Sequence, residues 1–447
     1  MSNPIARIRR AIVPACMLQP AHGGRWAPTL RDDLAMVDLT LAEGRIAAIA
    51  PTSAPELAGP DEAGDADADR TLDLNGGMLV PGLIDCHTHL DKGHMWPRHE
   101  NPDGTFASAM IAVDADRLGH WSAEDLRARA EFSLRCAYAY GTVALRTHLD
   151  SIGPQTDISW GVLDELRADW ADRIALQMVS LSHIDIAGDP EQNAHTVARV
   201  AASGGVLGAG MSGPADVRPK IEALFRMAMD AGLALDLHVD ENLDPESVTL
   251  RVIAETALKF GFDAPIQVGH CCSISVQEPD EVSRTLDLVA QAGIAVVSLP
   301  MCNMYLQDRV AGRTPRRRGV TIIQEMTARG ILVSAASDNT RDPFYGYGDL
   351  DLVETWREVA RIAQLDRPFG DWARLISANP ATAMGLTDRG VLAEGGSADL
   401  IAFPGARTYS ELFSRPQVDR IVLRAGQTID QSLPDYRTLD PIVGAPW

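Results

Sequence analysis

Short apolar stretches alternate with longer amphipathic segments through the middle of the chain. The apolar stretches predict buried strands, because each is short, mainly apolar and bounded by turn residues. These strands are expected at residues 78–84, 141–148, 174–181, 205–209, 233–239, 266–270, 295–299 and 331–336. Between them apolar positions follow a helical period, as in residues 123–140, 220–231, 245–260 and 279–292. Such repeated strand–helix alternation is what a (β/α)8 barrel requires.

The two ends of the chain differ from this middle. They hold short apolar segments separated by Gly- and Pro-rich turns, and the acidic stretch from Pro51 to Asp69 predicts a loop. We therefore predict an α/β protein with a (β/α)8 TIM barrel over residues 77–389. Residues 1–76 and 390–447 are expected to form one small β-sandwich domain built from both termini. A doubly wound sheet is the competing architecture, but no G-x-G-x-x-G sequence follows the first predicted strand.

Composition and charge narrow the class of protein. The 447 residues are 46% hydrophobic and 23% charged, which excludes disordered, collagen-like and coiled-coil proteins. The formal net charge of −21 disfavours binding to nucleic acid or anionic membranes. The chain shows neither an apolar run of the ~20 residues that span a membrane nor a secretory signal. Its 6 cysteines form no CxxC pair. We expect a cytoplasmic homo-oligomer without nucleic-acid or membrane partners.

Histidines and an aspartate stand at the carboxyl ends of several predicted strands. His87 and His89 end the first strand, and residues two apart on a strand point to the same side. The fifth strand ends at His238, the sixth at His270 and the eighth at Asp338. Any one of these could be a capping or core residue. Together, three imidazoles and one carboxylate at the catalytic face of a barrel suit a divalent ion such as zinc or iron(II), with one position open for water.

The segments around these residues resemble the amidohydrolase superfamily, specifically its cytosine deaminase-like group. The resemblance is carried by PGLIDCHTHLDK, NPDGTF, LRTHLD, LDLHVDE, VGHC, PMCNMYLQDR, TPRRRGVTIIQEM and DNTRDPFYGYG. It implies that His87, His89, His238 and Asp338 hold the ion. Members of the superfamily with two metals usually carry a carboxylated lysine at the end of the fourth strand. Residues 205–211 contain no lysine, so the resemblance implies one divalent ion per chain, zinc or iron(II).

Three side chains around the ion are candidates for catalysis. Asp338, touching both metal and water, can accept the proton of the water. His270 lies one strand over and is expected to orient the resulting hydroxide. Glu241 follows His238 by three residues, and in the family pattern HxxE this carboxylate passes a proton to the ring nitrogen of the substrate. A surface salt bridge is the alternative role for Glu241.

Three further positions correspond to the substrate contacts of cytosine deaminases. His183 stands where the family has glutamine, Asn339 where it has a second aspartate, and Phe344 where it has tryptophan. Because imidazole and a neutral amide present different donors and acceptors, we expect cytosine to be a poor substrate. The sequence leaves open whether four further residues act in the site or have only a structural role: Lys92, His94, His148 and Asp150.

Together these features predict a metal-dependent hydrolase that deaminates an amino-substituted nitrogen heterocycle and releases ammonia. A pyrimidine, pterin, triazine or creatinine-like ring fits this prediction. The alternative is hydrolysis of another C–N bond, such as N-dealkylation of an aminotriazine or opening of a cyclic amide. A binding protein that has lost catalysis is a third hypothesis, and the presence of every expected ligand and of Glu241 argues against it.

Overall fold

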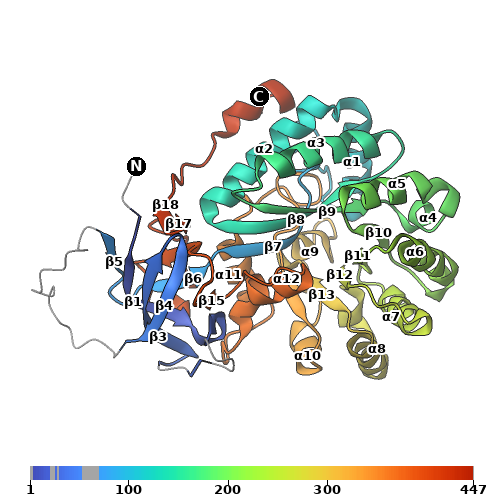
Figure 1. Cartoon of the computed structure of the whole chain (residues 1–447). Helices are drawn as coiled ribbons and strands as arrows, with labels where there is room; N and C mark the ends of the chain where they lie inside the picture. The colour runs from blue at the N-terminus through green and yellow to red at the C-terminus, as the bar shows by residue number, and fades with distance from the viewer. Residues whose placement is uncertain (1–3, 21–25, 28–29, 53–69, 446–447) are drawn as a thin grey trace, which may run out of the picture. The chain divides into compact units, whose positions relative to one another are not determined.

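The computed structural model describes residues 4–20, 26–27, 30–52 and 70–445 (Figure 1). The predicted loop from Pro51 to Asp69 therefore lies almost wholly outside the described residues. Contacts group the chain into two compact units. Unit 1 comprises Met1–Ile84, Tyr138–Val143 and Gln364–Leu433, and unit 2 comprises Asp85–Ala137, Ala144–Ala363 and Pro434–Trp447. The grouping places the last residues with unit 2, and the division predicted at residues 76 and 390 stays a prediction.

Unit 1 is built on a mixed β-sheet. Its described strands follow the order β18 (Gln427–Thr428), β17 (Ile421–Arg424), β16 (Leu400–Phe403), β6 (Met78–Pro81), β1 (Arg7–Pro14), β3 (Leu34–Ala42) and β4 (Arg45–Pro51), with β5 (Thr71–Asp73) beside β1. β15 (Leu392–Ala393) and β2 (Leu18–Gln19) form a separate parallel pair. The β3–β4 hairpin turns at Glu43 and Gly44, which both have positive φ angles, as tight hairpins require. Unit 1 also contains α12 (Ala378–Ala383) and α13 (Tyr409–Ser414).

The strand predicted over residues 78–84 is in fact divided between two sheets. β6 pairs antiparallel with β16, whereas the next strand, β7 (Leu83–Thr88), pairs with β8 (Thr142–Asp150). The break falls at Pro81 and Gly82, because proline lacks the N–H that continues a ladder. The Gly82 N–H donates to Asp399, and a Cβ at this glycine would lie 2.2 Å from Val143. A periodic pattern alone does not reveal such a change of partner.

Two sheets with parallel pairing form the centre of unit 2, although β7 and β8 begin in unit 1. One sheet has the order β7, β8 and β9 (Ala175–Leu181), in which β8 and β9 are parallel. The other is wholly parallel and consists of β10 (Leu207–Met211), β11 (Leu235–Val239), β12 (Ile266–His270), β13 (Ala295–Ser298) and β14 (Val333–Ala335). Every residue of β8, β12, β13 and β14 is buried, which fits strands covered on both faces. Isolated parallel bridges join Val179 to Val206 and Thr88 to Asp338.

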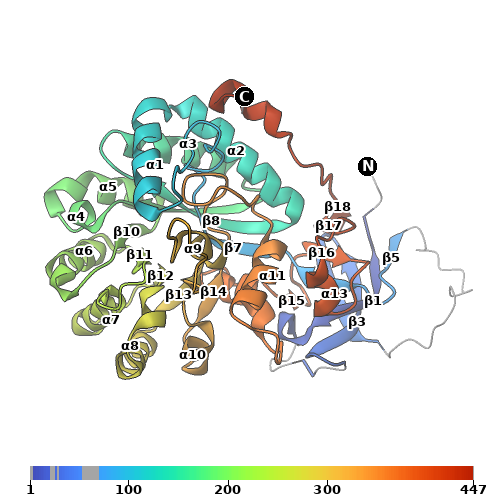
Figure 2. The same cartoon turned by 180° about the vertical axis from the view of Figure 1, so that it is seen from behind.

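The helices here are α1 (Phe106–His120), α2 (Ala123–Tyr140), α3 (Gln155–Asp169), α4 (Ile184–Ala187), α5 (Pro190–Ser203), α6 (Arg218–Ala231), α7 (Thr249–Phe260), α8 (Pro279–Gln291), α9 (Pro300–Leu306), α10 (Ile323–Ala328), α11 (Leu352–Ile362) and α14 (Asp440–Val443). Among them, α3, α5, α6, α7 and α8 follow strands of these sheets in the sequence and lie along their outer side (Figures 1 and 2). α5 shows why a helix forms here: Asp189 caps its start, Pro190 follows, and Gly204 ends it with a φ of 62°. The chain is therefore an α/β protein with parallel sheets, as predicted.

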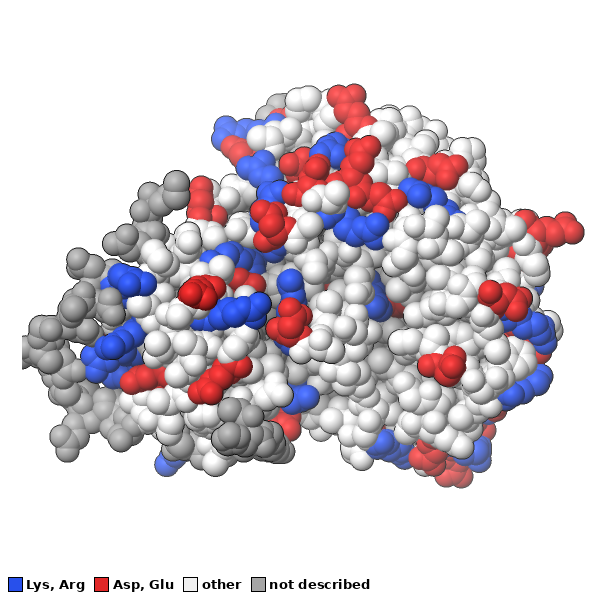
Figure 3. All heavy atoms as spheres, in the orientation of Figure 1, with Lys and Arg blue, Asp and Glu red and all other residues white. Residues whose placement is uncertain are grey.

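Charged side chains are interspersed on the face drawn in Figure 3, with basic residues close to acidic ones. Ion pairs of the described residues include Arg127 with Glu165 and Arg251 with Glu281. Within the described part of the chain, no helix combines the length and the apolar character that crossing a membrane requires.

Candidate active site

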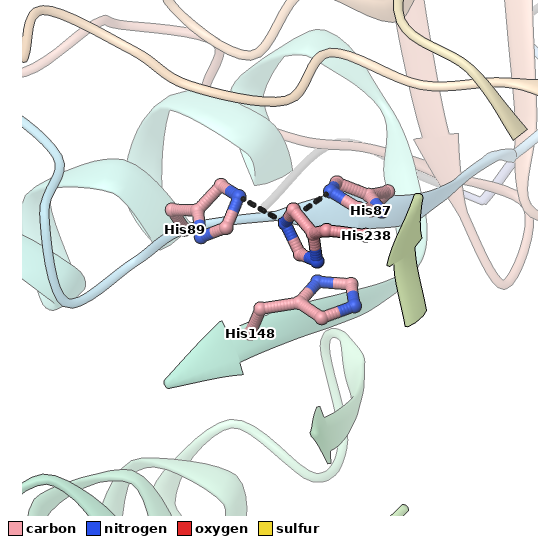
Figure 4. A group of neighbouring side chains, drawn as sticks. All are labelled: His87, His89, His148 and His238. Atoms are coloured by element: carbon pink, nitrogen blue, oxygen red, sulfur yellow. Dashed lines mark hydrogen bonds between the residues drawn. The ribbon is translucent and has the colours of Figure 1, made fainter. Parts of the chain in front are cut away.

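Three histidine side chains meet at the carboxyl ends of two strands. His87 lies in β7, His89 directly follows that strand, and His238 lies in β11 (Figure 4). The Nε2 atom of His238 is 3.2 Å from Nε2 of His87 and 3.2 Å from Nε2 of His89. His87 and His89 share one side of the chain because they are two residues apart in extended backbone. Their nitrogens therefore converge on one point.

The carboxylate of Asp338 lies against the same point. Its Oδ1 atom is 3.6 Å from Nε2 of His87 and 3.3 Å from Nε2 of His89. The thiol of Cys302 lies beside this carboxylate, which accepts no hydrogen bond from an N–H or O–H group of the described residues. The ligand atoms of a tetrahedral zinc site lie about 3.3 Å apart, given metal–nitrogen distances of about 2.0–2.1 Å. The residue types, the spacing and the unpartnered buried oxygens therefore fit a divalent metal ion.

The charge state of the histidines suits metal binding. Burial, and after it the neighbouring imidazoles or Lys92, hold the pKa values of His87, His89 and His238 well below 6.5. Neutral imidazole offers the lone pair that a metal requires. Burial also raises the pKa of Asp338 to about 8. A cation between these groups would favour the ionised carboxylate instead.

A fourth imidazole, His148 at the end of β8, belongs to the same cluster (Figure 4). Its ring centroid lies 4.0 Å from that of His87, and its Nε2 atom lies 3.2 Å from Oδ1 of Asp236. Arg146 and Gln267 hold that carboxylate in place through hydrogen bonds of 2.8 and 2.7 Å. His148 thus lies between the His87 ring and an anchored carboxylate.

The backbone turns sharply where two strands deliver their side chains. His270 and Asp338 both have φ angles of 66°, a left-handed conformation that costs energy for residues other than glycine. Neighbouring strands hold them there: the N–H of Cys271 donates to Val239 at 2.8 Å, and that of Asp338 donates to His87 at 3.0 Å. The surrounding sheet therefore fixes the direction of both side chains.

Glu241 and His270 lie together beside the metal-binding cluster. Oε1 of Glu241 is 3.4 Å from Nδ1 of His270, and Asn303 donates to the same Oε1 atom at 3.1 Å. Burial, and then the negative charge of Asp338, raise the pKa of Glu241 well above 4.5, against the hydrogen bond from Asn303. Burial and then His148 lower the pKa of His270 to about 3. The raised pKa favours the protonated form of Glu241, whereas His270 is neutral near pH 7.

These groups open into a cavity of about 340 Å³. His89, His238, Glu241 and His270 line one end of this cavity. Apolar side chains, among them Phe106, Met110, Leu181, Met211, Leu306 and Phe344, form much of the remaining wall, beside polar side chains such as Lys92 and Asp150. A mainly apolar cavity with a limited set of polar groups is the usual form of a small-molecule site.

The three residues predicted to contact the substrate all line this cavity, but in different settings. The side chain of His183 is 59% exposed, and its Nδ1 caps α4 by accepting from the N–H of Asp185. Asn339 is buried and donates to Asp342 at 2.7 Å. Phe344 packs against Phe106, with ring centroids 5.4 Å apart. His183 therefore lies at the rim, and Asn339 is already engaged by a carboxylate.

Lys92 is a buried cation on the cavity wall. Its Nζ atom donates to Oδ1 of Asp150 at 2.6 Å, and Asp91 accepts the backbone N–H of Asp150 at 2.7 Å. Burial would lower the pKa of Lys92, but Asp150 and then Asp91 raise it above its usual value. His94, in contrast, lines a separate cavity with Tyr436. Asp150 thus holds the Lys92 ammonium group in place.

Asn303 and Gln307 both contact Glu241, and the sequence alone assigns neither a role. Asn303 donates to the Glu241 carboxylate, and Gln307 donates to its backbone oxygen at 3.0 Å. The only signal was the segment PMCNMYLQDR within the family resemblance. Residues four apart lie on one face of a helix, so this spacing could have placed both side chains together.

Comparison with known proteins identifies the family. The model of the amidohydrolase family matches residues 175–429, more than half of the chain. Pterin deaminase of Rhizobium rhizogenes is 49% identical over 416 residues, which cover 93% of this chain and 92% of that protein. N-isopropylammelide isopropyl amidohydrolase of a Pseudomonas species is 21% identical over 74% of this chain and 80% of its own length.

A solved structure shows the same fold. The 5-methylcytosine deaminase of Klebsiella pneumoniae, liganded with 5-fluorocytosine, superimposes with a TM-score of 0.78 at 24% identity, covering 96% of this chain and 98% of that one. The cluster of histidines and aspartate, the family match and the 49% identical relative agree. The chain belongs to the amidohydrolase family.

Proposed function

We propose that this protein, a metal-dependent deaminase of nitrogen heterocycles, acts on a pterin. Water replaces the amino group on the carbon between two ring nitrogens, and the products are a ring carbonyl and ammonia. One observation carries the proposal, the 49% identity over 93% of the chain to a protein named pterin deaminase. The cavity of about 340 Å³ and the aromatic pair Phe106 and Phe344 on its wall support a flat bicyclic ring.

In this proposal His87, His89, His238 and Asp338 hold one divalent ion, zinc or iron(II). Bound there, such an ion lowers the pKa of a water molecule toward neutrality and so supplies hydroxide. β10 contains no lysine, which supports a single ion. The distances of 3.2–3.6 Å between donor atoms support four ligands around one point.

The protein side chains then have separate tasks. Among the described residues, the oxygens of Asp338 have no N–H or O–H partner, so Asp338 accepts the proton of the attacking water. Nε2 of His270 likewise has no partner in this part of the chain, and donates a hydrogen bond to the attacking oxygen. Glu241, with its raised pKa, gives a proton to the ring nitrogen beside the amino-bearing carbon. The water oxygen bonds to that carbon, and the C–N bond then breaks. Ammonia leaves with the proton that Asp338 took from the water, and the remaining hydroxyl proton passes to Glu241 and restores its protonated form.

We also propose the finer architecture in which the site is set. The two sheets of unit 2 close into one (β/α)8 barrel, and the mixed sheet of unit 1 belongs to a β-sandwich domain built from both termini. The parallel bridges from Val179 to Val206 and from Thr88 to Asp338 support closure, because each joins an edge of one sheet to the other. The site then occupies the carboxyl end of the barrel, where barrel enzymes bind substrate.

The test is ammonia release from pterin, cytosine, an aminotriazine and creatinine by the metal-loaded protein, measured as kcat/KM. We expect pterin to be the preferred substrate. N-isopropylammelide serves as a further arm, with isopropylamine as the measured product, because one relative is named for it. A higher kcat/KM for any other ring would contradict the proposed substrate.

A further inference from the structure

One carboxamide touches two of the proposed catalytic groups at once. Asn303 lies on α9, the short helix that follows β13, and is 1% exposed. Its Nδ2 atom is 3.1 Å from Oε1 of Glu241 and 2.9 Å from Nδ1 of His270. Backbone hydrogen bonds to Leu299 and from Gln307 fix the residue in the helix. A carboxamide nitrogen carries two hydrogens, so each can serve one of these acceptors.

This contact decides which nitrogen of His270 carries the proton. With Glu241 ionised, or with its proton on Oε2, the opposite amide orientation would set the Asn303 oxygen against Oε1 of Glu241, with two acceptors 3.1 Å apart. With Nδ2 facing both groups, Nδ1 of His270 accepts a hydrogen bond, and neutral imidazole must then carry its proton on Nε2. Nε2 has no partner among the described residues, and His270 belongs to a cluster with His87 and Asp338. The proton is therefore available to the attacking oxygen.

We infer that Asn303 is a positioning residue that holds His270 as the Nε2–H tautomer through its hydrogen bond to Nδ1. The inference rests on the proposed function, because it acts through the role given there to His270. It adds a requirement for catalysis beyond metal binding, namely that His270 keeps its proton on Nε2. Without Asn303, His270 could place its proton on Nδ1, toward Glu241, and turn a lone pair toward the attacking oxygen.

The first test inverts the hydrogen bond without changing the size of the side chain. Asn303→Asp presents only acceptors, so His270 must donate from Nδ1 and loses its donor at Nε2. We expect kcat for the preferred amino-heterocycle to fall about 10²–10³-fold, as when one donor to a developing oxyanion is removed. KM and metal content should change little. The decrease in kcat should be smaller for Asn303→Ala than for Asn303→Asp. A role in packing alone would give the reverse order.

A matched control is available in α5. Asn193 is also 1% exposed and donates its Nδ2 to a carbonyl, that of Ala187 at 3.0 Å, but it does not line the cavity. Asn193→Ala should lower the Tm as Asn303→Ala does and keep kcat. A direct readout is the ¹⁵N spectrum of histidine-labelled protein, in which the His270 tautomer should change from Nε2–H to Nδ1–H in Asn303→Asp.

A double-mutant cycle separates this role from an effect on Glu241 alone. The added charge in Asn303→Asp would still act on Glu241 when His270 is replaced by alanine. If Asn303 acts through His270, the double variant should be no slower than His270→Ala. If Asn303→Asp further lowered the kcat of an already impaired His270→Ala enzyme, the inference alone would be overturned. An unchanged His270 tautomer in Asn303→Asp would overturn the inference alone as well. A His270→Ala enzyme with the wild-type rate would overturn the proposed role of His270 as well.

Discussion

Replacing Glu241 with glutamine removes a proton donor and preserves almost everything else. Gln has the shape of Glu, and its carbonyl oxygen can still accept the hydrogen bond from Asn303 that Oε1 accepts at 3.1 Å. The side chain is only 13% exposed, so bulk water has little access to replace the lost proton transfer. General acid–base catalysis contributes about 10²–10⁴-fold, which corresponds to about 2.7–5.4 kcal/mol of activation free energy.

We expect Glu241→Gln to fall in the upper half of that range, because the group is buried. The assay is kcat for ammonia release at saturating substrate, together with metal analysis of the same preparation. The metal content should equal that of the wild type, since Glu241 is not among the proposed ligands. A rate near that of the wild type would refute the proton-transfer role, and loss of the metal would show that Glu241 is a ligand.

Three further predictions test the ligands, the pocket and the fold. His238→Ala should lose the ion, because its Nε2 atom lies 3.2 Å from those of both His87 and His89, and elemental analysis showing full occupancy would contradict this. Cytosine should be a poor substrate, and His183→Gln with Asn339→Asp should raise the ratio of kcat/KM for cytosine to that for pterin. The overall rate of this double variant should fall, because the introduced carboxylate would face Asp342. An unchanged ratio would contradict the role of both positions in substrate choice. Burial would raise the pKa of Asp116, but hydrogen bonds from Arg98, Trp121 and His99 hold it below 3.8. The Asp116 carboxylate therefore stabilises the folded state fully at pH values well above 3.8. This stabilisation is lost as the pH falls through the lower pKa of the folded state. Asp116→Asn should cost about 2–4 kcal/mol in urea denaturation at pH 7 and progressively less in acid, whereas a constant cost would contradict the pairing.

Local patterns predicted those parts of the molecule that depend on neighbours in the sequence. The strand over residues 266–270 was predicted to the residue, because Ile266 and Val268 stand two apart between Pro265 and His270. His87 and His89 could be placed on one side of a strand by their spacing alone. Residues 78–84 were wrongly predicted as one strand, because the choice of partner at Pro81 depends on Asp399 and β16, more than 300 residues away.

The site shows the same division between local and long-range information. The residue types at strand ends indicated which side chains could converge with Asp338. The rim position of His183 depends on α4, whose start it caps, and the role of Asn303 depends on how α9 packs after β13. Neither follows from periodicity, since both elements are shorter than eight residues.

The proposed ligands are also far apart in time during synthesis. Asp338 follows His87 by 251 residues (338 − 87), and the two lie side by side through the bridge between Thr88 and Asp338. At about 5–20 residues per second, translation leaves His87 and His89 without this carboxylate for about 13–50 s. β6 lacks its partner strand for longer, because β16 begins at Leu400. A ribosome-bound chain that stops before residue 338 should therefore not retain the ion. Stable metal binding is expected only late in synthesis, after Asp338 has been added.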